Sequence, residues 1–382
     1  MSQSKLNTLE TQKKKITLTD GSRLMIEGLA QAGVDTFVAY PITPSNWMYK
    51  YGKERFPQFY AAPDEITTLQ WMAGLAATGR FVATSSAFPG IALMVESINM
   101  AYAMELPMVI IITQRLGPST GSATTGAQGD LAILNGIISG NFPIPVISPS
   151  NFEDAWDLSA KAAEIAVKFR TPVFLLTSKE MVMYQKSFDL NSLKPIEKIE
   201  IKEPVITGDY KPYKATKNMV PPFLALGNEQ HLTRITASTH DEDANIRKND
   251  PEALANTQRL HDKFIKRIDE LTIYDYQQQK DANKLIVTWG ITADAARDAV
   301  AELKAQGENV DLLVVKALLP VSPKIYEIID QYDEVIIAEE NITGQYKEIL
   351  FGYRPVDKIK QVNKMGNMIT PEEIINIVKA RQ

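Results

Sequence analysis

Three short segments of the chain combine residue types that can bind and activate a small acidic molecule. The first, residues 40–45 (Tyr-Pro-Ile-Thr-Pro-Ser), follows an apolar run and precedes a helical pattern. Its two prolines restrict the backbone. Thr43 and Ser45 then bring hydroxyls to a helix start, where backbone N–H groups are free. A carboxylate can bind there, although the local chemistry by itself favours a hydroxyl cap without a ligand.

The second segment begins at Glu65, which follows Pro63 and Asp64 and opens a helical pattern. Glu65 is the first strong carboxylate of this helix and can take part in the chemistry of a site. It can equally be a charge that only stabilises the positive end of the helix.

The third segment, residues 114–121 (Gln-Arg-Leu-Gly-Pro-Ser-Thr-Gly), follows a continuous apolar strand pattern. The planar guanidinium of Arg115 fits a carboxylate bidentately, and the glycines let backbone N–H groups turn toward an anion. The alternative is a structural ion pair beside a tight turn. Because all three segments follow strands or begin helices, they can share one edge of one sheet, and together they favour a site for a small acidic ligand.

The elements that must position these segments alternate between strand and helix patterns. The sequence predicts strands at residues 36–40, 81–84, 107–113, 143–147 and 172–177, and helices at 22–32, 65–78, 91–103 and 152–169. Such alternation predicts an α/β fold with a parallel sheet covered by helices on both faces.

The later part of the chain divides into a connector and a second α/β unit. Prolines interrupt residues 191–280, where one helix is predicted at 251–271. Beyond it we predict strands at 285–289, 310–315 and 334–338, and helices at 292–305 and 371–380. We therefore expect domains at 1–190 and 281–382 joined by the 191–280 connector. Residues 340–345 (Glu-Asn-Ile-Thr-Gly-Gln) end a strand and are either a ligand site or a plain turn.

Composition excludes several classes of protein. The 382 residues carry a net charge of −5 and no long basic run, so we expect no nucleic acid partner. No apolar stretch suits a membrane helix or a secretory signal, and we expect a cytoplasmic protein with a frayed N-terminal tail. The chain has no cysteine and only three histidines without zinc spacing, so we expect no metal site on it. The acidic run at 240–243 is interpreted as a solvated loop.

The segments together resemble the alpha subunit of 2-oxoacid:ferredoxin oxidoreductases. The resemblance is carried by GVDTFVAYPITPS (33–45), DEITTLQWMAGLAATG (64–79), QRLGPSTG (114–121), QGDL (128–131), RTPVFLLTS (170–178) and ENITGQ (340–345), and it covers nearly the whole chain. The sequence departs from the family pattern at Pro63, where the family often has another acid. It also departs at residues 85–90, which are one residue longer than usual, and at residues 122–125.

The resemblance implies a thiamine diphosphate enzyme. The first domain would be the pyrimidine-binding domain, and the last a domain like the C-terminal domain of transketolase. Glu65 matches the glutamate that contacts the pyrimidine ring, while Thr43 and Arg115 match residues on the substrate side. We place the neighbouring side chains with the substrate as well, namely Tyr40, Ser45, Ser119 and Thr120. The implied reaction converts a 2-oxoacid, coenzyme A and oxidised ferredoxin to acyl-CoA, carbon dioxide and reduced ferredoxin.

The chain lacks the metal–diphosphate motif and any cysteine for an iron–sulfur cluster. We therefore expect a beta subunit that carries the magnesium ion, the diphosphate site and the cluster, and gamma and delta subunits are compatible with this arrangement. GPSTG (117–121) resembles 2-oxoglutarate enzymes, which makes succinyl-CoA the expected product. A branched-chain or broad-specificity enzyme, and a non-catalytic assembly subunit, stay open as alternatives.

Overall fold

The computed structural model describes residues 14–380, so most of the expected frayed tail lies outside the described residues. The α-helices are α1 (Gly21–Ala32), α2 (Asn46–Arg55), α3 (Glu65–Ala77), α4 (Phe88–Ala103), α5 (Leu131–Asn135), α6 (Phe152–Phe169), α7 (Lys179–Met183), α8 (Pro251–Ile265), α9 (Thr292–Ala305), α10 (Pro323–Ile329), α11 (Gln345–Phe351) and α12 (Pro371–Lys379). The strands are β1 (Ile16–Thr19), β2 (Thr36–Ala39), β3 (Gln58–Ala61), β4 (Val82–Ser86), β5 (Met108–Gln114), β6 (Val146–Ile147), β7 (Pro172–Ser178), β8 (Lys186–Asp189), β9 (Tyr274–Gln277), β10 (Lys284–Trp289), β11 (Asp311–Val315), β12 (Ala317–Leu319), β13 (Glu334–Glu339) and β14 (Ile359–Asn363). Two 3₁₀ helices lie at Leu190–Ser192 and Ile268–Leu271.

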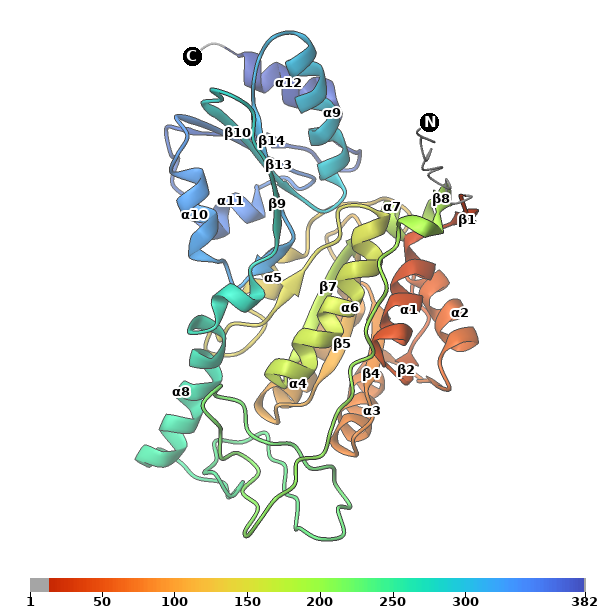
Figure 1. The fold of residues 1–382 in the computed structure, drawn as a ribbon, viewed down its shortest axis with the longest axis vertical. Coiled ribbons are helices and arrows are strands. Elements are labelled where there is room, and N and C mark those ends of the chain that lie inside the picture. The colour runs from red at the N-terminus through yellow and green to blue at the C-terminus, as the bar shows by residue number, and fades with distance from the viewer. Residues whose placement is uncertain (1–13, 381–382) are drawn as a thin grey trace, which may run out of the picture.

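A seven-stranded sheet forms the first α/β unit, in the order β12-β6-β7-β5-β4-β2-β3. All its strand pairs are parallel except β12 with β6. Helices α1 and α6 pack together on one face, and α3 and α4 pack together on the other (Figure 1). The central strands β5 and β7 are buried along their whole length, as parallel strands covered on both faces must be.

A second, five-stranded sheet has the order β14-β13-β10-β11-β9 and is parallel except for β9. It forms the blue unit at the top of Figure 1, and α9 and α12 pack together on one of its faces. The α/β prediction with two parallel sheets is confirmed. The domain boundaries at 190 and 280 stay a proposal, and two strands cross them. Strand β9, from the connector, joins the second sheet, while β12, from the last hundred residues, joins the first.

Most predicted elements occur with their expected bounds, and the exceptions have local causes. Helices α6 and α9 begin and end as predicted. The predicted strand at 143–147 is only β6, because prolines at 143 and 145 remove backbone donors from the ladder. The predicted 251–271 helix ends at Ile265, and a 3₁₀ turn follows. Strand β4 extends to Ser86, two residues beyond the prediction.

The connector packs on the first unit through buried charges. Glu105, at the end of α4, is fully buried and receives hydrogen bonds from Lys263 Nζ (2.9 Å) and Arg259 Nη1 (3.0 Å) of α8. The expectation of a solvated loop at 240–243 is wrong in part, because His240 and Asp241 are buried. The Asp241 carboxylate accepts bonds from the backbone and from Arg247, which organises the loop. Across residues 14–380, no helix is long and apolar enough to span a membrane.

Candidate functional site at the carboxyl edge of the first sheet

The three predicted segments leave neighbouring strands of the first sheet at the same edge. Strands β2, β4 and β5 are adjacent and parallel, so their carboxyl ends lie side by side. Residues 40–45 follow β2, α4 begins after β4, and Arg115 follows β5. Helix α3, which begins at Glu65, follows edge strand β3 and packs against α4. The topology therefore gathers the predicted residues at the edge where open α/β sheets bind ligands.

Arg115 and Thr43 are in direct contact. Arg115 Nη1 donates a hydrogen bond of 2.5 Å to the backbone carbonyl of Thr43, although 72 residues separate them in sequence. The Thr43 hydroxyl accepts a bond from the Asn46 side-chain amide at 3.0 Å. The Arg115 side chain is buried, and its Nε has no hydrogen-bond partner in the described structure. An arginine with an unused buried donor can still bind an anion.

Ser45 has a different environment from the one predicted. It is the N-cap residue of α2, but its hydroxyl makes no capping bond. The hydroxyl instead donates to the Ser86 carbonyl at 3.0 Å and bonds Thr113 Oγ1 at 2.9 Å. Ser45 is 1% exposed, and its two bonds connect the loop after β2 to β4 and β5 inside the protein. We correct the substrate-contact assignment of Ser45 to a positioning role, because its hydroxyl is already bonded and is closed off from the surface.

Glu65 lies in the first turn of α3, and Asp64 caps this helix by accepting from Thr67 N at 2.7 Å. The Glu65 side chain is buried against Gly90 and Ser86. A β-carbon on Gly90 would lie 2.6 Å from Glu65 Cγ and 2.1 Å from Ser86 Oγ. Gly90 therefore leaves the space that the Glu65 side chain occupies. Nothing in the sequence pattern distinguished Ser86 or Gly90 as site residues.

The remaining predicted residues lie at the rim. Tyr40 is 36% exposed at the end of β2. Ser119 and Thr120 are exposed on a turn closed by a bond from Ser122 N to the Leu116 carbonyl at 2.9 Å. No hydrogen bond among the described residues joins these three side chains to Glu65, Thr43 or Arg115. Their substrate-binding role stays a prediction.

Gln128, from the QGDL segment, joins the two sheets at this edge. Its side chain donates to the Trp289 carbonyl at 2.8 Å and accepts from Glu340 N at 2.8 Å and Thr292 Oγ1 at 3.0 Å. Its backbone N–H bonds the Glu340 carbonyl at 2.8 Å. The ENITGQ segment therefore forms an interface with the first unit and is more than a plain turn. Both motifs, QGDL and ENITGQ, are recognisable in the sequence, but only the structure shows that they are in contact.

Two carboxyl groups near this junction are strongly perturbed. Burial raises the pKa of Asp130 to about 7, although Arg115 acts in the opposite direction. Burial also raises the pKa of Glu340 to about 7, even though it accepts a bond from Ile369 N at 3.2 Å. Groups that titrate near neutrality are common at functional sites.

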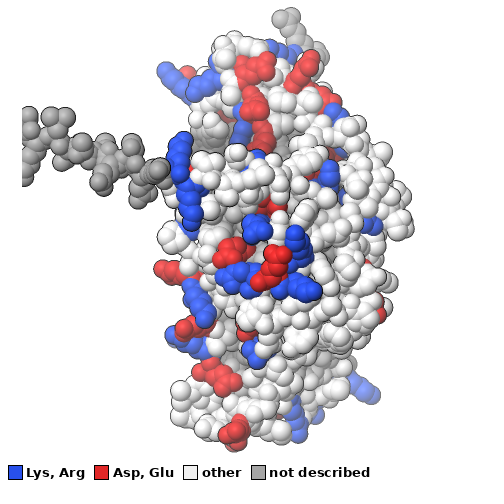
Figure 2. All heavy atoms as spheres, turned by 90° about the vertical axis from the view of Figure 1, so that its right-hand side faces the viewer, with Lys and Arg blue, Asp and Glu red and all other residues white. Residues whose placement is uncertain are grey.

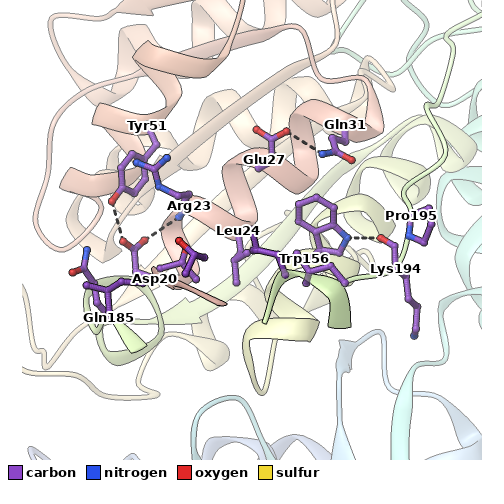
Figure 3. A pocket seen from close by; sticks show the side chains of 15 residues that line it. Asp20, Arg23, Leu24, Glu27, Gln31, Tyr51, Trp156, Gln185, Lys194 and Pro195 are labelled. Atoms are coloured by element: carbon purple, nitrogen blue, oxygen red, sulfur yellow. Dashed lines mark hydrogen bonds between the residues drawn. The ribbon is translucent and has the colours of Figure 1, made fainter. Parts of the chain in front are cut away.

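A cavity of about 640 Å³ lies elsewhere, along α1 (Figure 3). Leu24 and Trp156 form part of its wall, and Tyr51 donates to Asp20 at 2.9 Å in another part of the same wall. The Trp156 indole N–H donates to the Lys194 carbonyl at 2.8 Å. None of the predicted site residues lines this cavity, and the polar groups just described are paired within the protein. The sheet edge is therefore the better candidate site.

Comparison with known families decides between a generic anion site and a specific one. The family model for the thiamine diphosphate-binding region of pyruvate flavodoxin/ferredoxin oxidoreductases matches residues 27–263, more than half of the chain. The chain belongs to this family. The matched region contains the sheet edge with Glu65, Thr43 and Arg115, so the resemblance drawn from the sequence is confirmed.

The chain is similar over almost its full length to subunits of such enzymes. It is 27% identical to the 2-oxoglutarate synthase subunit KorA of Methanocaldococcus jannaschii, covering 94% of this chain and 98% of that protein. It is 30% identical to the ketoisovalerate oxidoreductase subunit VorB of Methanothermobacter thermautotrophicus, covering 95% and 97%. The chain is thus an alpha subunit of a 2-oxoacid:ferredoxin oxidoreductase.

Solved structures support the same fold. A 2-oxoglutarate:ferredoxin oxidoreductase from Magnetococcus marinus, with 2-oxoglutarate, coenzyme A and succinyl-CoA bound, matches with a TM-score of 0.88 and 26% identity. The match covers 96% of this chain but 65% of that one. A split-gene transketolase matches with a TM-score of 0.52 at 16% identity, which shows a transketolase-like fold and nothing further.

Proposed function

We propose that this alpha subunit supplies the pyrimidine side of a thiamine diphosphate site and the substrate-side wall of an enzyme that oxidises 2-oxoglutarate to succinyl-CoA. The observation that carries the proposal is the placement of Glu65 and the Arg115–Thr43 pair along one edge of the sheet. A proton-exchanging carboxylate and a carboxylate-binding guanidinium are the two groups that such a half-site needs. Coenzyme A and ferredoxin would be the other reactants.

The residues at the edge fit thiamine diphosphate. Glu65 is buried in the space left by Gly90, where its carboxylate can share a proton with a ring nitrogen. Bound thiamine diphosphate supplies the nucleophilic carbon and the electron sink that decarboxylation of a 2-oxoacid requires. The role of Glu65 is to hold and return the proton at the pyrimidine ring.

Arg115 binds and orients the substrate in this proposal. Its guanidinium pairs with a carboxylate of the 2-oxoacid, and the Thr43 carbonyl holds it in place. The Thr43 hydroxyl, which accepts from Asn46, keeps its own hydrogen free to donate to a substrate oxygen. Tyr40, Ser119 and Thr120 would line the entrance. An orientation preset before binding lowers the entropic cost of reaching the reactive geometry.

The other half of the site would come from a beta subunit, because the chain has neither cysteine nor the metal–diphosphate motif. Helices α3 and α4 suit such a partner, since both carry large apolar side chains that are exposed: Ile66 and Trp71 on α3, and Leu93 and Met100 on α4. Exposed apolar side chains that gather on a surface are typical of interaction sites. Figure 2, which faces the right-hand side of Figure 1, shows mostly uncharged side chains over its right-hand half. The magnesium ion and iron–sulfur cluster are assigned to this partner.

The choice of 2-oxoglutarate rests on relatives and not on a pocket. KorA proteins are 2-oxoglutarate synthase subunits by their description. Independently of them, the GPSTG segment resembles 2-oxoglutarate enzymes in its sequence. The second candidate is a branched-chain 2-oxoacid, because VorB is a ketoisovalerate enzyme subunit and is 30% identical. Broad specificity is the third, suggested by the alpha subunit of the 2-oxoacid enzyme from Saccharolobus solfataricus, of which this chain spans 63%. A cytoplasmic location and further gamma and delta subunits belong to the same proposal.

The deciding experiment is a substrate panel on the purified complex. Reduction of methyl viologen would be followed with 2-oxoglutarate, pyruvate and 2-oxoisovalerate, each with coenzyme A. We expect 2-oxoglutarate to give the highest kcat/KM. A preference for 2-oxoisovalerate would replace the proposed substrate and keep the reaction class. Glu65→Gln should abolish the turnover of any of them, and wild-type rates in this variant would support an assembly subunit instead.

A further inference from the structure

Asp130 is a buried carboxyl group that the predicted site did not include. It is the N-cap residue of α5 and is 6% exposed, yet its side chain makes no capping bond. An aspartate in this position normally accepts a bond from the second or third backbone N–H of its helix. Asp130 Oδ2 has no hydrogen-bond partner among the described residues. The carboxyl group is therefore free for another role.

Gln345, from the second α/β unit, takes over the capping of α5. Its side-chain oxygen accepts from Ala132 N at 2.9 Å, and its amide donates to the Gly129 carbonyl at 2.8 Å. The backbone N–H of Asp130 is held by Gln114 Oε1 at 3.2 Å. The backbone groups around Asp130 are therefore bonded by the side chains of Gln114 and Gln345. The Asp130 carboxyl group is not needed to begin the helix.

The neighbour that acts on Asp130 is Arg115. It is the charged group in the described structure whose interaction with Asp130 is large enough to affect the pKa of this carboxyl group. Arg115 carries an unused buried donor at Nε, and Asp130 carries an unused buried oxygen at Oδ2. Buried polar atoms without partners are rare and costly. Two of them on electrostatically coupled side chains indicate a place that a ligand completes.

We propose that Asp130 is a further substrate-positioning residue, whose protonated carboxyl group donates a hydrogen bond to the 2-oxoacid carboxylate that Arg115 binds. This inference rests on the proposed function of Arg115. Arg115 supplies N–H donors and the neutral carboxylic acid supplies an O–H donor, so the anion meets donors from two sides. An ionised Asp130 would instead repel the substrate carboxylate in a poorly solvated place.

The proposal has a direction in pH. Asp130 loses its proton near neutrality, because burial opposes the charged form. When a substrate carboxylate pairs with Arg115, the cation no longer favours ionisation of Asp130, so the bound complex retains the proton. Substrate binding is then linked to proton uptake, and KM rises by up to tenfold for each pH unit above the pKa of the free enzyme. The substrate carboxylates stay ionised throughout this range, since ordinary carboxyl groups have pKa values of about 4.

The test is the pH profile of KM and kcat for 2-oxoglutarate, measured from pH 6.5 to 9 on the assembled complex. Wild type should show a KM that rises at alkaline pH with little change in kcat. Asp130→Asn keeps a neutral donor, so its KM should be nearly independent of pH. Asp130→Ala removes the donor and should have a high KM without an alkaline slope. Thermal unfolding of each variant separates misfolding from weak binding.

Glu340→Gln is the matched control, because Glu340 is also buried with a pKa of about 7 but is bonded to Ile369 N and is not coupled to Arg115. It should keep the alkaline rise in KM.

Calorimetric titration of the thiamine diphosphate-depleted complex, in two buffers of different ionisation enthalpy, should show proton uptake in wild type and none in Asp130→Asn. An unchanged slope or unchanged proton uptake in Asp130→Asn would overturn the inference while the proposed function stands. A wild-type complex without 2-oxoacid-dependent viologen reduction would overturn the function itself.

Discussion

Arg115 Nη1 donates a 2.5 Å hydrogen bond to the backbone carbonyl of Thr43, which joins the loop after β5 to the loop after β2. Strand β4 lies between these two strands in the sheet, so the contact crosses over its end. The bond leaves the hydroxyl of Thr43 and the remaining guanidinium donors available. The substrate-side wall is therefore built from two loops that hold each other before any ligand binds.

Replacing Arg115 tests this wall. Arg115→Lys keeps a positive charge but loses the planar fork, and Arg115→Ala loses both. We expect KM for the 2-oxoacid to rise about 10- to 100-fold in Arg115→Ala, as for the loss of a charge-assisted hydrogen bond of about 1.5–3 kcal/mol. Arg80→Ala is the control, because Arg80 is a surface arginine paired with Asp35 at 3.6 Å. Equal KM values for all four proteins would favour a structural ion-pair role for Arg115.

Replacing Gly90 tests the position of the Glu65 side chain, whereas replacing Glu65 tests only its presence. Gly90→Ala places a β-carbon 2.6 Å from Glu65 Cγ, so the glutamate must move, although alanine favours the helix. We expect kcat to fall about 10-fold or more through the displaced proton donor, and Glu65→Gln to lower it further. Gly136→Ala, at the end of α5, meets no atom within 4 Å and should leave both activity and stability close to wild type. Stopped-flow viologen reduction with thermal melts would separate the two effects.

The buried ion pair of the connector predicts a stability effect far from the site. Lys263→Met leaves Glu105 buried without its Nζ partner, so we expect a loss of about 3–5 kcal/mol in the free energy of unfolding. Guanidinium or urea titration would measure it. Lys266→Met is the control, because Lys266 is exposed and pairs with Asp262 on the surface. A loss under 1 kcal/mol in Lys263→Met would mean that Arg259 alone compensates Glu105.

The same pair predicts acid sensitivity. Burial opposes the ionised form of Glu105, but Lys263 and Arg259 outweigh it and lower the pKa from 4.5 to about 2. A depressed carboxyl pKa contributes stability that is fully present above pH 4.5 and is lost as pH falls toward 2. Lys263→Met should therefore lose less stability than wild type between these pH values. Denaturant titrations at pH 5, 4 and 3 would show a smaller slope in the variant.

The α3–α4 face predicts an assembly defect. Trp71 is 43% exposed in the middle of α3, the helix that begins at Glu65. Trp71→Glu places a charge where the beta subunit is proposed to pack, so we expect co-purification of the two subunits to fail while the alpha subunit stays folded. Leu254→Glu, on exposed α8 away from this face, should assemble normally. Analytical ultracentrifugation of the mixtures would decide, and normal assembly of Trp71→Glu would move the interface elsewhere.

The sequence determined the element types and the identity of the site loops. The spacing of apolar residues and the residues at the helix ends predicted the bounds of α6 and α9 correctly. Long amphipathic helices with clear ends are specified by residues close together in the chain. The polar and charged residues that follow β2 and β5 predicted Thr43 and Arg115 as site residues, because ligands of parallel sheets bind at the carboxyl ends of the strands. The strongest local signals therefore concerned residues close together in the chain.

Only the tertiary structure decided which groups are free to act. Ser45 was predicted to contact a substrate, but its hydroxyl is used by Ser86 and Thr113, 41 and 68 residues away. Asp130 occupies the N-cap position of α5, yet Gln345, which follows a strand of the other sheet, bonds the start of this helix and leaves the Asp130 carboxyl group unused. The physical reason is that hydrogen-bond partners and burial come from segments distant in sequence. A residue's availability for chemistry is set by those partners and not by its own neighbours.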